Sequence, residues 1–104
     1  MSWTIEFFSG VTKDVLKLPP NLQARIIRLF DLMEKQGVNL GAPHSKKITD
    51  DLYEVRAKAK EGIARGIYCY CDKRKIVVLH VFMKKTQKTP VKDFKLAIDR
   101  KKRL

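Results

Sequence analysis

The chain has 104 residues, 44% of them hydrophobic, which is enough for one core and too little for a second domain. No stretch approaches the roughly 20 apolar residues that span a membrane, and the first residues lack the basic start and apolar run of a signal peptide, so we expect a cytoplasmic protein. The formal net charge is +12: residues 46–104 hold eighteen basic and seven acidic residues, whereas residues 1–45 hold five and four. An excess confined to one half favours a polyanionic partner, nucleic acid first, over a membrane surface.

The first half of the chain predicts one strand and two helices. Residues 3–8 alternate apolar and polar side chains, except at the last position, and predict a strand. Ser9 is placed to cap a short helix, which Pro19-Pro20 would end. A longer helix is predicted from Asn21 to Gln36, because its apolar residues recur on one face and Gly37 suits its C-terminal end.

The second half predicts a loop, three strands and a last helix. Two short turns separate the strands, which indicates an antiparallel meander. Thr89 and Pro90 suit the start of a terminal helix that ends in a basic run, Arg100 to Arg103. The predicted segments are a loop at 38–50, strands at 52–58, 63–71 and 76–84, and a helix from 90 onward. The expected fold class is therefore α+β in the order β-α-α-β-β-β-α, one domain over residues 1–104, with a mostly antiparallel four-stranded sheet, two N-terminal helices and a C-terminal helix.

The two cysteines, Cys69 and Cys71, predict no disulfide framework and no metal site. Side chains two apart on a strand project from the same face, but one pair cannot staple a domain. A zinc site needs four ligands, and His44 and His80 are the only histidines. We expect two small hydrophobic side chains in a reducing compartment and no cofactor.

A cationic cluster is predicted where the meander meets the last helix. Its members are Arg56, Arg65, Lys84, Lys85 and Lys88. The two arginines lie on successive strands and share one face of the sheet if the short turn pairs them closely. Lys84 and Lys85 would point to opposite faces of a continuing strand, and the parity of Lys84 with His80 favours Lys84 as the one that joins the arginines.

Three pieces of the chain carry a resemblance to a known family. They are Leu52-Tyr53-Glu54-Val55-Arg56, Arg65-Gly66-Ile67-Tyr68, and the stretch His80-Val81-Phe82-Met83-Lys84-Lys85-Thr86-Gln87-Lys88-Thr89-Pro90 with the closing helix around Ala97. In this order and spacing the chain resembles toxins of the RelE/ParE superfamily, in the HigB-like branch that includes phage-derived Gp49-like proteins.

The resemblance implies a RelE-like fold and the toxin of a type II toxin–antitoxin pair. Such toxins enter the ribosomal A site, cut the mRNA there without a metal and inhibit translation. The resemblance also implies a small antitoxin as partner, usually a helix-turn-helix DNA-binding protein, with operator DNA reached only through the antitoxin. No cofactor is implied.

Cleavage of RNA without a metal requires attack of the ribose 2′-hydroxyl on the adjacent phosphorus, giving a 2′,3′-cyclic phosphate and a 5′-hydroxyl. Guanidinium groups suit the charge on the phosphoryl oxygens, because they stay protonated and fork onto phosphate. The candidate catalytic residues are Arg56, Arg65, Lys84, Lys85, His80 and Glu54. His80 suits proton transfer, or is a hydrogen-bonded core histidine. Glu54 is a base, or the ion-pair partner of Arg56; because RelE resembles this chain with a lysine there, and because its late tyrosine has no counterpart here, the acid and base stay open.

Further residues are candidates for contact with RNA outside the reacting phosphate. These are Lys88, Tyr68, Tyr53, Lys58, Lys46, Lys47, Arg100 and Lys101. Tyr53 and Tyr68 would either stack on a base or serve as ordinary strand aromatics. The basic run at the end of the last helix would either touch RNA or only complement the helix dipole.

Two other functions fit the same sequence. A ParE-like toxin would inhibit DNA gyrase, but a gyrase inhibitor has no need of a phosphate-stabilising cluster. A non-catalytic nucleic-acid-binding module of phage origin would bind tightly and in a salt-sensitive manner without turnover, but the predicted sheet lacks the paired exposed aromatics of an RNA-recognition platform.

Overall fold

A computed structural model describes residues 3–37, 45–49, 52–71, 74–84 and 90–104. The elements follow the order that the sequence predicts, with one additional strand. Their bounds are β1 Thr4–Phe7, α1 Val11–Leu16, α2 Pro20–Gln36, β2 Ser45–Lys47, β3 Leu52–Ala59, β4 Gly62–Cys71, β5 Lys75–Lys84 and α3 Val91–Lys102. None of the described helices has the length and apolar character that crossing a bilayer requires.

The five strands form one mixed sheet in the order β1-β5-β4-β3-β2. Strands β3, β4 and β5 are the predicted antiparallel meander, and β1 joins its far edge parallel to β5. The expected four-stranded sheet needs a correction, because β2 lies within the predicted loop and pairs antiparallel with β3. β2 has only three residues, and its place comes from pairing with β3.

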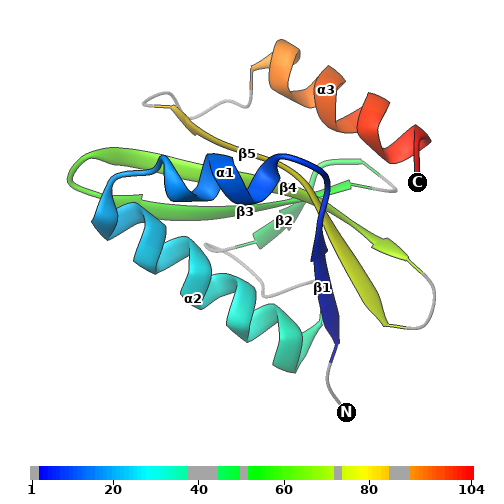
Figure 1. The fold of residues 1–104 in the computed structure, drawn as a ribbon, viewed down its shortest axis with the longest axis horizontal. Coiled ribbons are helices and arrows are strands. Elements are labelled where there is room, and N and C mark those ends of the chain that lie inside the picture. Colours follow the sequence, from blue (N-terminus) through cyan, green and yellow to red (C-terminus); the bar gives the residue numbers. More distant parts are fainter. Residues whose placement is uncertain (1–2, 38–44, 50–51, 72–73, 85–89) are drawn as a thin grey trace.

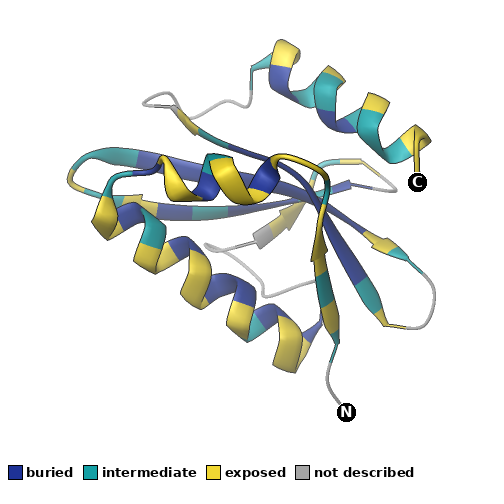
Figure 2. Cartoon of the chain, in the orientation of Figure 1, coloured by how far each residue is buried: buried dark blue, intermediate teal, exposed yellow. Residues whose placement is uncertain are grey.

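The helices cover both faces of the sheet, as Figure 1 shows for α2 and α3. The larger core lies between the sheet and the helices α1 and α2, whose buried side chains include Leu22, Ile26 and Phe30. The smaller core lies under α3, where Ala97 packs against Ile67 and Leu79. The central strands and the inner stripe of α2 are buried, and the outer surface of every helix is exposed (Figure 2). Removing each large aliphatic side chain from water contributes roughly 1.5–3 kcal/mol, which makes these two layers the main support of the sheet.

The helix ends differ from the sequence prediction at the starts of α1 and α3. Gly10, with a φ of 88°, stands at the N-cap of α1, and no side chain caps this helix, so the expected capping by Ser9 is wrong. Gly37 ends α2 as predicted, and its φ of 96° is one that residues other than glycine rarely adopt. A Cβ there would lie 3.0 Å from the ring of Trp3. Pro90, expected in the first turn of α3, stands at its N-cap, and no side chain of the described residues caps this helix. Thr89, the expected cap, lies outside the described residues.

A β-bulge in β5 decides which side chains reach α3. The register of β4 with β5 shifts between Ile67, opposite His80, and Tyr68, opposite Val78, so that Leu79 is the extra residue. Leu79 and His80 are consecutive, yet Leu79 packs in the core under α3 and His80 bonds to Asp93 of that helix. A regular strand would turn one of them to the opposite face.

Candidate active site around the paired arginines

Arg56 of β3 and Arg65 of β4 stand directly opposite each other. The β3–β4 hairpin pairs Ala59 with Gly62 at the turn, and each arginine lies three residues away from the turn along its strand. Opposite residues of antiparallel strands project from the same face with Cβ atoms about 4.5–5.5 Å apart. The sequence prediction that the two arginines share one face is confirmed. We call this face, which also carries α3, the arginine face.

Glu54 neutralises part of this paired charge. Arg56 donates from Nε to Oε1 of Glu54 over 2.6 Å, and the side chain of Glu54 is fully buried. Arg65 is fully buried too, whereas the side chain of Arg56 is 16% exposed. Burial lowers the pKa of Arg65, the neighbouring Arg56 lowers it further, and Glu54 raises it. Of the two functions proposed for Glu54, the ion pair with Arg56 is the one present in the structure.

Lysine positions on β2, β3 and β5 lie in register with the arginine face. Lys46 of β2 stands opposite Glu54 and is exposed, so it belongs to this face. Lys58 stands opposite Ile63, which in turn stands opposite Lys84, so the two lysine positions occupy one cross-strand row beside the arginines. That register supports Lys84 over its neighbour as the predicted companion of the arginines.

Other predicted lysines lie elsewhere or cannot be placed. Lys47 pairs with Tyr53 and therefore belongs to the opposite face of the sheet. Lys85 and Lys88 lie outside the described residues. Lys101 is half-buried near the end of α3.

His80 is held by an acidic residue that the sequence analysis missed. Its Nε2 lies 2.7 Å from Oδ1 of Asp93, both side chains are largely buried, and its ring stacks on Phe82. Nδ1 of His80 is buried and has no hydrogen-bond partner among the described residues. This geometry favours the hydrogen-bonded core histidine. The available signal for Asp93 was its place in the first turn of α3, but an acid there is already explained by the helix dipole.

The structure excludes Tyr68 as an RNA contact and shows what Tyr53 and Arg100 contact within the fold. Tyr68 is fully buried in the core against α1 and α2, so it cannot stack on a base, and Tyr53 stacks on it with 5.6 Å between ring centroids. Both tyrosines therefore lie opposite the arginine face. Arg100 donates from Nη1 to the backbone oxygen of Leu79 over 2.7 Å and lies over the ring of Phe8, which fixes α3 to the sheet.

The cysteines and the acidic residues form no metal site in the part of the chain that the structure describes. Cys69 is buried, Cys71 is half-buried, and both are free thiols. Within the same residues, no three side chains of His, Cys, Asp or Glu gather closely enough to hold a metal ion.

Comparison with protein families identifies the chain. The family model described as "Phage derived protein Gp49-like (DUF891)" matches residues 13–102, which is most of the sequence. The chain belongs to the Gp49-like family. No curated protein matches this Gp49-like chain.

Solved structures show that the Gp49-like chain has the RelE-like toxin fold. A mutant of the Escherichia coli toxin RelE in the free state is 14% identical, with a TM-score of 0.72 over 96% of this chain and 98% of that one. The archaeal RelE–RelB complex from Pyrococcus horikoshii has a TM-score of 0.63 at 23% identity over 85% and 100% of the two chains. The toxin–antitoxin complex RelBE2 from Mycobacterium tuberculosis has a TM-score of 0.59 at 21% identity over 81% and 100%. At these identities the likeness shows the fold.

Proposed function

We propose that this Gp49-like protein is the toxin of a type II toxin–antitoxin pair and that it inhibits translation by cleaving mRNA in the ribosomal A site. The observation that carries the proposal is the pairing of Arg56 with Arg65 beside Glu54 on the arginine face. Two positive charges held side by side within a fold destabilise it, and such arrangements cluster at functional sites. The RelE-like fold supports the same conclusion.

The proposed reaction needs no metal. The 2′-oxygen forms a bond to phosphorus, the bond from phosphorus to the 5′-oxygen breaks, and the products carry a 2′,3′-cyclic phosphate and a 5′-hydroxyl. One base takes the 2′ proton, and one acid protonates the leaving oxygen. Arg56, the more exposed of the two arginines, contacts the phosphoryl oxygens, and Arg65 supplies a fixed positive charge beside it. Glu54 orients Arg56 through their ion pair.

The proton transfers are assigned to groups near the arginines. Lys84 occupies the row next to them, and we assign it, with Lys85 and Lys88 as alternatives, to protonation of the leaving oxygen. His80 is the alternative proton carrier, through a shift of the Asp93 contact that now holds it. Glu54 is fully buried and engaged by Arg56, so we do not assign it to take the 2′ proton.

The proposed partner is a small antitoxin. Two of the similar structures are toxin–antitoxin complexes, one of them an archaeal RelE–RelB complex. We expect the antitoxin of this protein to be encoded beside it, to have a helix-turn-helix DNA-binding fold, and to provide the only contact with operator DNA.

The test is cleavage of a defined mRNA by the purified protein with and without programmed ribosomes. Primer extension maps the cuts, and direct 5′-labelling by polynucleotide kinase without prior phosphatase treatment detects the 5′-hydroxyl. We expect ribosome-dependent cuts, and a loss of about 10²–10³ in rate for Arg56→Ala. Lys13→Ala removes the same charge from an exposed position on α1 and is expected to cleave at the wild-type rate.

Three results would decide against the proposal. Intact mRNA in every reaction, with growth unaffected on induction, would exclude the nuclease. Intact mRNA combined with DNA damage on induction would instead support a ParE-like gyrase inhibitor, and salt-sensitive RNA binding without cleavage would support the non-catalytic binding module.

A further inference from the structure

An open groove runs along the edge of the sheet next to the paired arginines. It has a volume of about 690 Å³ and lies between the outer side of α2 and the C-terminal half of β3. The described residues that line it are Arg25, Arg28, Leu29, Leu32, Arg56, Ala57 and Lys58. β2 pairs with β3 only as far as Val55, so the edge of β3 beyond that residue lines the groove and is not covered by the described part of β2.

The groove is cationic and its shape is fixed by a hydrogen bond. Arg25 and Arg28 are one turn apart on α2, and Arg25 donates from Nη1 to the backbone oxygen of Lys58 over 2.8 Å. Its described lining contains four cations and no acid. Arg28 and Lys58 are exposed and have no ion pair within the described ranges. Four cationic side chains along one groove, of which Arg56 is ion-paired with Glu54, raise the local potential, which favours a polyanionic ligand.

The apolar part of the lining distinguishes between polyanions. Leu29 and Leu32 of α2 and Ala57 of β3 line the groove together with the cations, so apolar surface lies beside the positive charge. A single strand presents both phosphates and unstacked bases, so it can use the cations and the apolar lining together. A duplex keeps its bases stacked inside and would leave the leucines without a partner.

Arg56 connects the groove to the candidate active site. It lines the groove and also stands opposite Arg65 and bonds to Glu54. We propose that the groove binds the sugar–phosphate backbone and bases of the single-stranded RNA that flanks the scissile phosphate, so that one strand passes Arg56 and continues along α2. This inference rests on the proposed nuclease function and adds the place where the substrate strand is held.

The test measures binding separately from cleavage. The probe is a fluorescent 2′-O-methyl octauridylate, which lacks the attacking hydroxyl, titrated at several salt concentrations with wild-type protein and with Arg25→Gln/Arg28→Gln. We expect the double variant to bind at least about tenfold more weakly, with a salt slope smaller by about 1.4, since each single-strand phosphate contact contributes about 0.7. Arg28→Gln alone keeps the bond from Arg25 to β3. It is expected to weaken binding by about threefold and to reduce the salt slope by about 0.7.

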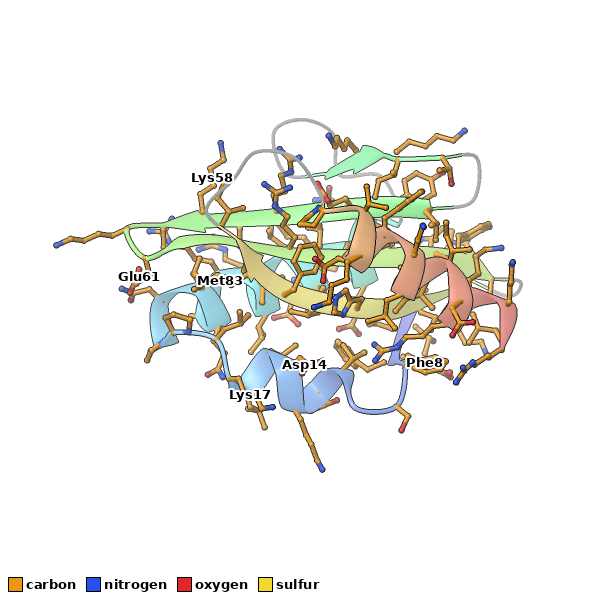
Figure 3. All side chains as sticks on the ribbon, turned by 90° about the horizontal axis from the view of Figure 1, so that it is seen from above. Phe8, Asp14, Lys17, Lys58, Glu61 and Met83 are labelled. Carbon is orange, nitrogen blue, oxygen red and sulfur yellow. The ribbon has the colours of Figure 1, made fainter. Side chains whose placement is uncertain are left out.

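A charge-matched control separates the groove from net charge. Lys13→Gln/Lys17→Gln removes two exposed cations from the α1 region, and Figure 3 shows Lys17 on the opposite side of the molecule from Lys58. The control is expected to bind the probe within about twofold of wild type. Equal losses in both double variants, or no binding by the wild type, would overturn the inference.

A duplex probe and a cleavage assay complete the design. The affinity for an RNA duplex with the same number of phosphates is measured in the same way. If Arg25→Gln/Arg28→Gln weakens duplex binding by the same factor as octauridylate binding, the groove recognises folded RNA such as ribosomal RNA, and the single-strand assignment is wrong. Groove-dependent binding of the octauridylate without any ribosome-dependent cleavage would refute the nuclease and leave the RNA groove standing. Cleavage by the wild type, with cleavage and binding unchanged in the groove variant, would refute the groove alone.

Discussion

Replacing Glu54 by glutamine tests whether this carboxylate makes the arginine pair tolerable inside the fold. Glu54→Gln keeps the size of the side chain and an oxygen that can accept from Arg56, but it removes the negative charge that lies 2.6 Å from that guanidinium. The positive charges of Arg56 and Arg65, which stand opposite each other, would then lose the compensation that this carboxylate supplies. The expected result is a large loss of stability with an unchanged fold.

The magnitude follows from burial. Removing one partner of a buried ion pair costs about 3–5 kcal/mol, and Glu54 and Arg65 are both fully buried. Because the side chain of Arg56 is 16% exposed and water screens part of its charge, we expect the lower end, about 3 kcal/mol. A domain of this size has about 5–15 kcal/mol in total, so the variant would still fold in dilute buffer.

Urea unfolding followed by circular dichroism measures the effect. With a slope of about 1.5 kcal/mol per molar urea, the midpoint should fall by about 2 M. Inorganic phosphate should restore more stability to Glu54→Gln than to the wild type, because a bound anion replaces the missing carboxylate charge. The control is Glu6→Gln, which breaks an exposed 3.7 Å ion pair with Lys75 and should cost less than about 1 kcal/mol. A loss below about 1 kcal/mol for Glu54→Gln, or equal stabilisation of both proteins by phosphate, would refute the reasoning.

Three further substitutions test the attachment of the helices. Asp93→Asn weakens the buried bond to His80 and should lower the free energy of unfolding by about 1.5–3 kcal/mol. Deuterium exchange of the backbone amides should accelerate more in α3 than in α2, and equal acceleration throughout the chain would contradict a local role. Gly37→Ala places a Cβ 3.0 Å from the Trp3 ring at a φ of 96°, so it should cost at least about 1 kcal/mol and shift the emission of Trp3, the single tryptophan; an unchanged spectrum and urea midpoint would show that this contact is absent. Ala97→Leu overfills the fully buried contact between α3 and the sheet and should cost about 1–3 kcal/mol in thermal unfolding, whereas an increase in melting temperature would reveal an unfilled space there.

The sequence predicts the meander and the arginine pair for a simple physical reason. Alternating side chains mark the strand that carries Arg56, and an apolar run marks the last strand. The expectation that Arg56 and Arg65 meet depends on a short turn, and the two-residue turn between Ala59 and Gly62 supplies that register. The strand patterns and the length of the turn are both properties of short, continuous stretches of the chain. The family resemblance rests on these same residues, and the fold comparison agrees with it.

The missed features depend on contacts between distant segments. β2 is a strand because the edge of β3 offers it a partner, and no alternation of its own three residues predicts one. Asp93 is buried because the bulge at Leu79 brings His80 under α3, and no residue pattern marks that bulge. Tyr68 is buried in the core because α2 packs on its face of the sheet. Strand periodicity shows which residues share a face, but it does not show which face α2 covers.

The position of β1 sets the order in which the chain can acquire its fold during synthesis. Thr4 lies beside Lys75, so the N-terminal strand has no partner until β5 has left the ribosome, and closing so long a loop is slow and comes late in folding. A product that terminates before β5 leaves β1 and β4 as unpaired edges, which makes it prone to aggregation and a target for proteases. A complete arginine face, with α3 docked above it, therefore exists only when translation of the protein's own message is almost finished.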